Sequence, residues 1–210
     1  MMLLDKQCKK LGIPLIDKTL TYTGRPELAI LEYFKQKGYT GIHCEGGTML
    51  MLLKACMLNG LIKYNIFNDR KDAINRHLEA QLTILDDKKE ELIELIKLTP
   101  KEGIFDNFSS IINSDFIRNI YPSLSIRTGE VMFDTVGREK LFELAKVFAA
   151  NPYQYRSGWP DLTLIRDKSI KFVEVKTTDN LHKSQLTTIP VILDVLPNTI
   201  VVCRVKRIIN

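Results

Sequence analysis

The polar and apolar residues in the first part of the chain follow two periodicities in turn. Starting at Pro26, apolar residues recur at helical spacing until Gly38 breaks the pattern. The β-compatible segment YTGIHC follows and leads into the turn EGG. A mainly apolar stretch at residues 48–58, rich in methionine and interrupted by Lys54, then predicts a buried helix whose methionines fill a core. The pattern therefore predicts a helix, a strand and a second helix.

Long amphipathic patterns replace this alternation after about residue 68. Two helical stripes are present, the first formed by Ile74, Leu78, Leu82 and Leu85 and the second by Leu92, Ile93 and Ile96. Pro100 stops the second stripe, and further helical patches lie near residues 104–120 and 137–150. Since no catalytic spacing is recognisable here, we interpret this stretch as a helical, structural subdomain.

Strand patterns return in the last part of the chain. The segments DLTLI and IKFVEVKT, joined by the turn RDKS, predict a β-hairpin. A helix is expected to begin near Asp179 and Asn180, and TIVVCRVK predicts a last strand. Pro190 is expected to kink or interrupt that helix. The chain thus ends in a unit of hairpin, helix and strand.

Charged residues at one end of this hairpin indicate metal chemistry. Side chains alternate along a strand, so Glu174 and Lys176 must point to the same face. Pairing through the turn at residues 166–169 brings Asp161 to the same end. Two carboxylates suit Mg²⁺ or Mn²⁺, and an ammonium group beside them favours attack of water on phosphorus. Taken singly, each residue is more often an ordinary turn or surface residue, and only their order favours catalysis.

Composition and charge leave the class of partner open. The chain has 210 residues, of which 45% are hydrophobic and 26% charged, and this is typical of a globular protein with a sizeable core. The 30 basic and 25 acidic residues give a formal charge of +5. Such a charge permits a polyanionic partner and equally fits an ordinary, mildly basic enzyme.

The cysteines and the apolar runs bear on the compartment. Cys8, Cys44, Cys56 and Cys203 lie far apart without zinc-ligand spacing, which favours reduced thiols in a cytosolic protein. The apolar run at the start is too short for a signal peptide, and the run TMLMLLKACML is too short for a membrane span. We therefore expect a protein that is neither secreted nor membrane-bound and that acts in the cytoplasm, at the nucleoid, or in a nucleus.

The hairpin motifs together resemble a known group of nucleases. Pro160-Asp161, an apolar hairpin and then Glu174-x-Lys176 form the pattern of the PD-(D/E)xK superfamily. The segments GWPDL, FVEVK and DNLHKSQ are similar to its virus-type replication-repair nuclease (VRR-NUC) branch, with matches at Gly158, Pro160, Asp161, Leu162, Glu174, Val175, Lys176, Asp179, Leu181 and Gln185. The run ELAILEYFKQKGYTGIHCEGG is similar to the corresponding stretch of the Fanconi-associated nuclease.

This resemblance covers about residues 27–206 and implies the fold. It implies an α/β protein with a restriction-endonuclease-like PD-(D/E)xK core, in which helices flank a mixed central sheet. Residues 1–210 then form a single VRR-NUC nuclease domain that carries a helical insertion at about residues 60–150.

The resemblance also implies a set of site residues. The Glu of the H-x-E-G segment is a metal ligand in the Fanconi-associated nuclease, which gives that role to Glu45, while Glu27 competes for it or only complements a helix dipole. One or two Mg²⁺ or Mn²⁺ ions are then held by Glu45, Asp161, Glu174 and the carbonyl of Val175. The further catalytic residues implied are Lys176, which positions the attacking water, and Gln185, which orients the site or a phosphate.

Basic residues and histidines near the motifs are assigned to DNA contacts or to packing. The side chains predicted to contact phosphates are Arg156, Lys183, Arg204, Lys206 and Arg207, although scattered basic residues are usually solvated surface. His43 and His182 flank the catalytic segments, and we interpret them as packing or phosphate-contact residues rather than metal ligands.

The predicted function is metal-dependent, structure-selective hydrolysis of phosphodiester bonds in branched or flap-containing DNA, in repair or replication. The helical insertion is a feature of the Fanconi-associated nuclease, whose nuclease domain acts as a monomer on 5′ flaps. This favours a monomeric 5′-flap or branched-end endonuclease with 5′ exonuclease activity.

The sequence does not include the DNA-binding and helical-repeat regions of that relative, so an accessory protein is expected to supply DNA recognition. Two alternatives stay open. One is a dimeric Holliday-junction resolvase like the short VRR-NUC proteins, and the other is a nucleic-acid binding module without catalysis.

Overall fold

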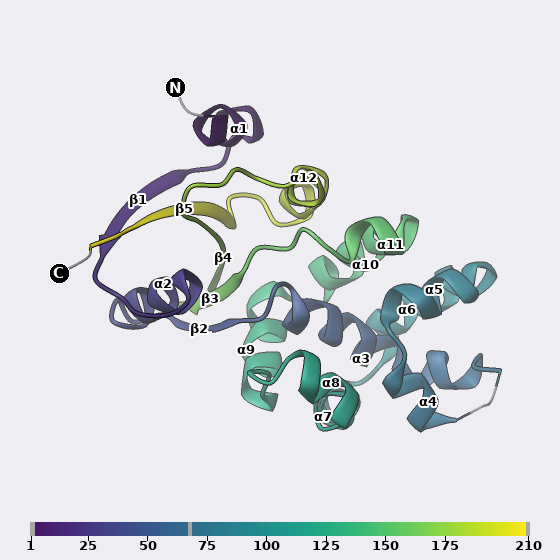
Figure 1. The fold of residues 1–210 in the computed structure, drawn as a ribbon. Coiled ribbons are helices and arrows are strands. Elements are labelled where there is room, and N and C mark those ends of the chain that lie inside the picture. The colour runs from purple at the N-terminus through teal and green to yellow at the C-terminus, as the bar shows by residue number, and fades with distance from the viewer. Residues whose placement is uncertain (1–2, 67–68, 209–210) are drawn as a thin grey trace. The chain divides into compact units, whose positions relative to one another are not determined.

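The computed structural model describes residues 3–66 and 69–208, which form two compact units (Figure 1). The first unit comprises residues 1–46 and 157–210 and contains the strands, whereas the second, residues 47–156, is helical. The helical unit is wider than the insertion predicted at about residues 60–150. The interpretation of the whole chain as a single nuclease domain stays a prediction.

A five-stranded sheet forms the centre of the first unit. Its strands in spatial order are β1 (Leu15–Leu20), β5 (Ile200–Arg207), β4 (Ser169–Lys176), β3 (Leu162–Arg166) and β2 (Thr40–His43). β1 and β4 both run parallel to β5, whereas β3 is antiparallel to β4 and to β2. The prediction of an α/β fold with a mixed sheet is therefore confirmed.

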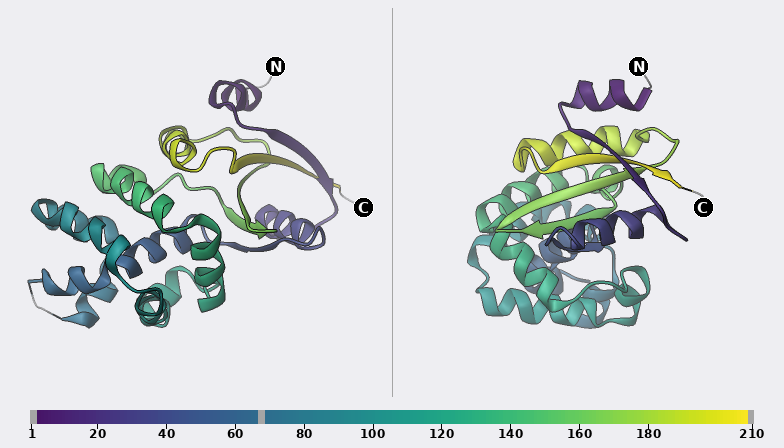
Figure 2. Two further views of the ribbon diagram at one scale, coloured as in Figure 1. Left: turned by 180° about the vertical axis from the view of Figure 1, so that it is seen from behind. Right: turned by 90° about the vertical axis from the view of Figure 1, so that its left-hand side faces the viewer.

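Helices cover both faces of this sheet. α2 (Pro26–Lys35) lies on one face, and α1 (Leu3–Leu11) and α12 (Lys183–Val195) lie on the other (Figures 1 and 2). α2 buries its apolar residues against a cluster from the strands, formed by Leu162, Leu164, Val173, Val175, Val201, Cys203 and Val205. Because side chains alternate along β4, Glu174 and Lys176 point to the opposite face, toward α1 and α12.

β3 and β4 form the predicted hairpin, in which Arg166 pairs with Ser169. The two residues between them, Asp167 and Lys168, have φ angles of 51° and 60°, as two-residue hairpin turns require. This short turn fixes the register of the hairpin. Asp161, which precedes β3, is thereby brought to the end of β4 that carries the charged residues.

The second unit is built around α3 (Gly47–Lys63), which is buried along nearly its whole length, including the methionines predicted as core. Within this unit α3 packs against α6, α7 and α9. The remaining helices are α4 (Arg70–Asn75), α5 (Leu78–Ile84), the short 3-10 helix η1 (Asp86–Lys88), α6 (Lys89–Leu98), α7 (Lys101–Ile112), α8 (Asp115–Ile120), α9 (Ile126–Val136), α10 (Arg138–Ala150) and α11 (Pro152–Tyr155).

The prediction of one continuous helix from Ile74 to Leu85 is wrong. The helix is interrupted at Arg76 and His77, which separate α4 from α5. The fully buried Lys54 donates hydrogen bonds to the backbone carbonyls of Ile74 and Arg76, at 2.6 and 2.5 Å. In a continuing helix these carbonyls would accept backbone N–H groups from the next turn. The buried ammonium group of Lys54 replaces these backbone N–H donors, and α4 ends.

The predicted start of the last helix is also wrong. α12 begins at Lys183 rather than near Asp179, because the Asp179 carboxylate binds the ammonium group of Lys176 instead of capping a helix. Pro190 lies inside α12 without interrupting it. Buried apolar side chains on both sides of the proline hold the helix together and offset the hydrogen bond that the proline removes.

The first residues of the chain form two elements that the sequence patterns did not predict. α1 and β1 precede residue 27, where the resemblance begins, and Asp17 and Lys18 interrupt the apolar alternation of β1. The four cysteines are buried and form no disulfide, as predicted. Within the described residues, no helix has the length and apolar character that crossing a lipid bilayer requires.

Gly158 allows the entrance of the hairpin to approach α12 closely. Its φ angle is 84°, and a Cβ atom at this position would lie 2.3 Å from the carbonyl oxygen of Ser184. Gly12 has a similar φ of 67°, but a Cβ there meets no described atom within 4 Å. A substitution at Gly12 therefore causes backbone strain alone, whereas the same substitution at Gly158 adds steric overlap.

We predict that Gly12→Ala lowers the free energy of unfolding by about 1 kcal/mol, through backbone strain alone. Gly158→Ala should lower it by about 3 kcal/mol or more, because steric overlap adds to the strain. Urea unfolding followed by the fluorescence of Trp159, the only tryptophan in the sequence, measures both values in the first unit. Equal losses in the free energy of unfolding would show that Gly158 is required only for its positive φ angle and not for the close approach to α12.

Candidate active site

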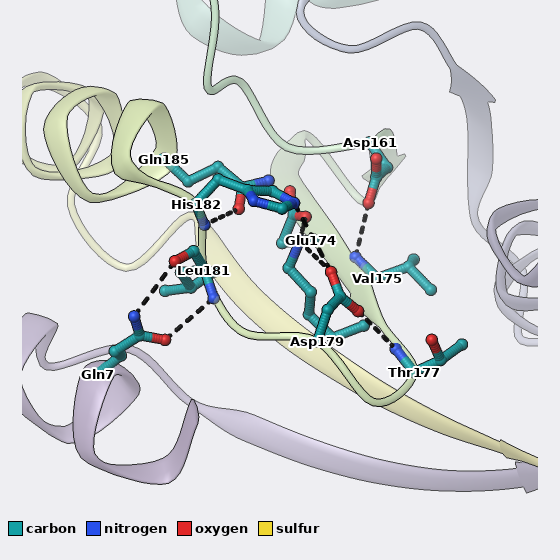
Figure 3. Close-up of polar contacts among 10 residues, drawn as sticks. Gln7, Asp161, Glu174, Val175, Thr177, Asp179, Leu181, His182 and Gln185 are labelled. Carbon is teal, nitrogen blue, oxygen red and sulfur yellow. Dashed lines mark hydrogen bonds and ion pairs between the residues drawn. The ribbon is translucent and has the colours of Figure 1, made fainter. Parts of the chain in front are cut away.

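The ends of three strands meet at Asp161. Its backbone carbonyl accepts hydrogen bonds from the N–H groups of Cys44 and Glu45, at 3.1 and 3.3 Å. Its side-chain Oδ2 accepts the N–H of Val175 at 2.7 Å (Figure 3). The β3–β4 ladder ends before this point, so the carboxylate continues the pairing where the backbone of β3 leaves off. Asp161 thereby fixes the positions of Glu45 and Val175 relative to itself.

The backbone of β4 also determines where the carbonyl of Val175 points. In a strand, the N–H and C=O of one residue point to the same neighbouring strand, and successive residues alternate. The N–H of Phe172 bonds to Thr199, on the β5 side. Val175, three residues later, therefore faces the other side, where its N–H meets Asp161. Its carbonyl points to that side as well, as the predicted role of a ligand requires.

Glu174 and Lys176 form a buried ion pair on the sheet face toward α12. Their side chains are 1% and 4% exposed, and Nζ of Lys176 lies 2.9 Å from Oε1 of Glu174. The same ammonium group lies 3.2 Å from Oδ2 of Asp179, in the segment that follows β4. Nε2 of His182 lies 3.7 Å from that oxygen. Lys176 is thus held between two carboxylates.

Burial and mutual repulsion disfavour ionisation of the carboxyl groups. Burial, and after it the charge of Asp161, raises the pKa of Glu174 to about 7. Burial also raises the pKa of Asp161, and the negative charge of Glu27 adds to this effect. For Lys176, burial alone would lower the pKa, but the charge and hydrogen bond of Glu174 outweigh it and hold the pKa above its usual value. Ionisation of all these carboxyl groups would therefore place more negative charge in the site than its one buried ammonium group neutralises.

The donor atoms of this site fit a divalent cation. One ligand atom each from His43, Glu45 and Asp161 lie within 4.8 Å of one another. In addition, the buried Oε2 of Glu174 accepts no hydrogen bond from the described part of the chain. A hard cation compensates both the clustered carboxylates and the unpaired oxygen, because oxygen donors are the preferred ligands of Mg²⁺ and Mn²⁺. The roles of the individual residues stay predictions.

A cavity of about 410 Å³ contains the predicted residues Glu45, Asp161, Glu174, Val175, Lys176 and Gln185 in its lining. Gln185 lies in the first turn of α12, where its Oε1 accepts the N–H of His182 at 2.9 Å. Glu27, in the first turn of α2, also lines the cavity but is not part of the cluster of potential ligands. The geometry thus favours Glu45 over Glu27 as the third carboxylate.

The basic residues predicted to contact DNA differ in their surroundings. Those that reach solvent are Arg156, Lys183, Lys206 and Arg207. Arg204 instead lies 3.2 Å from Asp5 and 2.6 Å from Asp17, and its side chain is only 13% exposed. Two carboxylates neutralise its guanidinium group, so we no longer assign Arg204 to DNA binding.

Three residues near the site were not predicted to belong to it. His43, interpreted from the sequence as a packing or phosphate-contact residue, lies among the potential ligands, and its position two residues before Glu45 is the only signal for this in the sequence. Asp179 was matched within a motif but was not given the role of partner to Lys176. Gln7 contacts the backbone of Leu181 and carries no sequence signal, because 174 positions separate the two residues.

A scan against protein-family models and a search of curated proteins find no match for this sequence. Among solved structures, paFAN1 bound to 5′ flap DNA of two nucleotides with a gap matches with a TM-score of 0.68 and 19% identity, over 97% of this chain and 41% of that chain. The chain has the fold of this part of paFAN1. The structure of paFAN1 with a one-nucleotide 5′ flap matches with a TM-score of 0.69 and 20% identity, over 99% and 42% of the two chains.

The likeness to paFAN1 confirms the fold that the resemblance to the Fanconi-associated nuclease implies. The chain spans less than half the length of the paFAN1 chains that it matches.

The position of His43 leads to a prediction about the bound ion. We predict that Mn²⁺ added to the protein shows a ¹⁴N coupling in electron spin-echo spectra, because an imidazole nitrogen lies among the clustered donors. His43→Gln should remove the coupling and weaken Mn²⁺ binding about tenfold. His182→Gln serves as the control, since His182 lines the cavity but lies outside the cluster. A coupling that persists in His43→Gln would exclude this residue as a ligand.

Proposed function

We propose that this protein is a metal-dependent nuclease that hydrolyses phosphodiester bonds of DNA. The observation that carries the proposal is the convergence of Asp161, Glu174 and Lys176 at one end of the hairpin, in a fold shared with a protein crystallised on DNA. A site with several carboxylates and one ammonium group suits a phosphodiester, because a bound cation and the ammonium group offset its charge. The presence of every expected ligand type supports an active enzyme over an idle binding module.

The residues that would hold one or two Mg²⁺ or Mn²⁺ ions are Glu45, Asp161, Glu174 and the carbonyl of Val175, with His43 as a further donor. When bound, such an ion supplies positive charge that stabilises the negative charge developing on the phosphate. Lys176 stays protonated, because its pKa lies above the usual value. Its ammonium group therefore orients the attacking water as a hydrogen-bond donor rather than as a base. Gln185 orients the site or a phosphate from the start of α12.

We propose 5′ flaps and branched ends as the preferred DNA, with 5′ exonuclease activity, and a role in DNA repair or replication. Both paFAN1 structures contain 5′ flap DNA with a gap, which supports this choice. Contacts to phosphates, from Lys183 beside the cavity and from Lys206, provide binding that weakens steeply as salt is raised. We further propose that the protein acts as a monomer and that an accessory protein supplies further DNA recognition.

Substitution of the carboxylates tests the proposed chemistry. Asp161→Asn and Glu174→Gln should each lower cleavage of a labelled 5′ flap in Mn²⁺ by about 10²- to 10³-fold or more, because each removes one charge that holds the ion. Glu45→Gln should be inactive, whereas Glu27→Gln should keep substantial activity, because Glu27 is not among the clustered donors. An inactive Glu27→Gln together with an active Glu45→Gln would show that Glu27, and not Glu45, is the third carboxylate.

A panel of DNA structures tests the proposed substrate. Purified protein, shown by light scattering to be a monomer, should cut 5′ flaps and branched ends faster than 3′ flaps, single strands or four-way junctions. A symmetric junction resolvase works as a two-fold dimer, because it makes two matched cuts. A stable dimer that resolves four-way junctions and leaves flaps intact would replace this substrate assignment with a Holliday-junction resolvase.

A further inference from the structure

A side chain of the N-terminal helix α1 binds the segment that follows β4. The carboxamide of Gln7 donates from Nε2 to the carbonyl oxygen of Leu181 at 3.2 Å, and its Oε1 accepts the N–H of Leu181 at 3.0 Å (Figure 3). The side chain therefore satisfies both backbone groups of one residue, as a neighbouring strand would. Such a paired contact fixes the position of the segment as well as its distance from α1.

The segment that Gln7 binds carries the second partner of Lys176. Residues 177–182 connect β4 to α12, and they contain both Asp179 and the buried Leu181. Asp179 places Oδ2 at 3.2 Å from the Lys176 ammonium group and accepts the N–H of Thr177 on Oδ1 at 3.3 Å. Gln7 thus holds the segment two residues after the carboxylate that contacts Lys176.

α1 is itself firmly attached to the sheet. Leu4 and Cys8 are buried, at 1% and 2% exposure. On the same helix, Asp5 lies 3.2 Å from the guanidinium group of Arg204 on β5, and this guanidinium group also binds Asp17 on β1. Gln7 therefore lies on a helix that is bonded to β5 and, through Arg204, to β1. Both strands belong to the sheet that carries Glu174 and Lys176.

We propose that Gln7 is a positioning residue of the active site: by fixing the backbone of Leu181 it holds Asp179 against Lys176, and so orients the ammonium group. This inference rests on the proposed function for its effect on catalysis, but its structural part concerns Lys176 alone. Among the described residues, Gln7 belongs neither to the cluster of potential ligands nor to the lining of the cavity. Without it, the segment loses two hydrogen bonds and Lys176 retains Glu174 as its remaining close partner.

The structural part is tested by the ¹⁵N signal of the Lys176 ammonium group, assigned by its loss in Lys176→Arg. In the wild-type protein this group is 4% exposed and held by two carboxylates, so its hydrogens should exchange slowly with water. Gln7→Leu, which keeps the size of the side chain and removes both hydrogen bonds, should shift the signal and speed exchange severalfold. Gln36→Leu makes the same chemical change at an exposed position of this unit and should leave the signal unchanged.

The catalytic part is tested by a double-mutant cycle on a 5′ flap in single turnover. Gln7→Leu should slow cleavage about tenfold without changing DNA affinity, and it should have no further effect in an Asp179→Asn background, because the two residues act through one contact. Gln7→Glu, which keeps an acceptor for the Leu181 N–H but sets a carboxylate oxygen against the Leu181 carbonyl, should also slow cleavage and serves if Gln7→Leu does not fold.

Two results would overturn the proposal. One is an unchanged Lys176 signal in folded Gln7→Leu and Gln7→Glu, and the other is a loss of rate in the Asp179→Asn background as large as in the wild type. If the wild-type protein cleaves no DNA at all, the proposed function fails, whereas the Lys176 signal still decides the role of Gln7.

Discussion

The organisation of the first unit depends on two carboxyl groups, the half-buried Asp161 and the buried Glu174, that stand near each other with a single buried ammonium group. Burial disfavours the anionic form of each, the charge of Asp161 further raises the pKa of Glu174, and the charge of Glu27 further raises the pKa of Asp161. A fold retains such an arrangement only where surrounding groups compensate it. Here the Val175 N–H binds Asp161 and Lys176 binds Glu174, while one oxygen of Glu174 has no donor among the described residues. The missing compensation is what a divalent cation supplies.

The hairpin was predictable because its determinants are local. The turn, the alternation along β4 and the positions of Asp161, Glu174 and Lys176 are all encoded within about twenty consecutive residues, and strand geometry then brings the three together. The choice of Glu45 came from a resemblance, and the position of this residue beside Asp161 depends on pairing between β2 and β3. The local pattern therefore predicts Asp161 and Glu174, and the family resemblance adds Glu45.

The features that the sequence did not reveal depend on contacts between distant segments. The break between α4 and α5 is caused by Lys54, which reaches the carbonyls from another helix. The late start of α12 follows from the pairing of Asp179 with Lys176 rather than from its helix-capping propensity. Likewise, the contact of Gln7 with Leu181 joins the first helix to a loop near the other end of the chain. No periodicity or spacing encodes such contacts.

Thermal unfolding at pH 8 shows most directly whether a cation relieves the negative charge that collects when Glu174 and Asp161 ionise. Since the pKa of Glu174 lies above its value in the unfolded chain, the ionised carboxylate costs stability, and that cost is fully developed above pH 7. Saturating Mn²⁺ should therefore raise the Tm of the wild-type protein by about 4 °C or more. Glu174→Gln should melt higher than the wild type in EDTA and gain little from Mn²⁺. A wild-type Tm that does not change with Mn²⁺, together with a Tm of Glu174→Gln below that of the wild type in EDTA, would show that Glu174 carries no uncompensated charge for a cation to relieve.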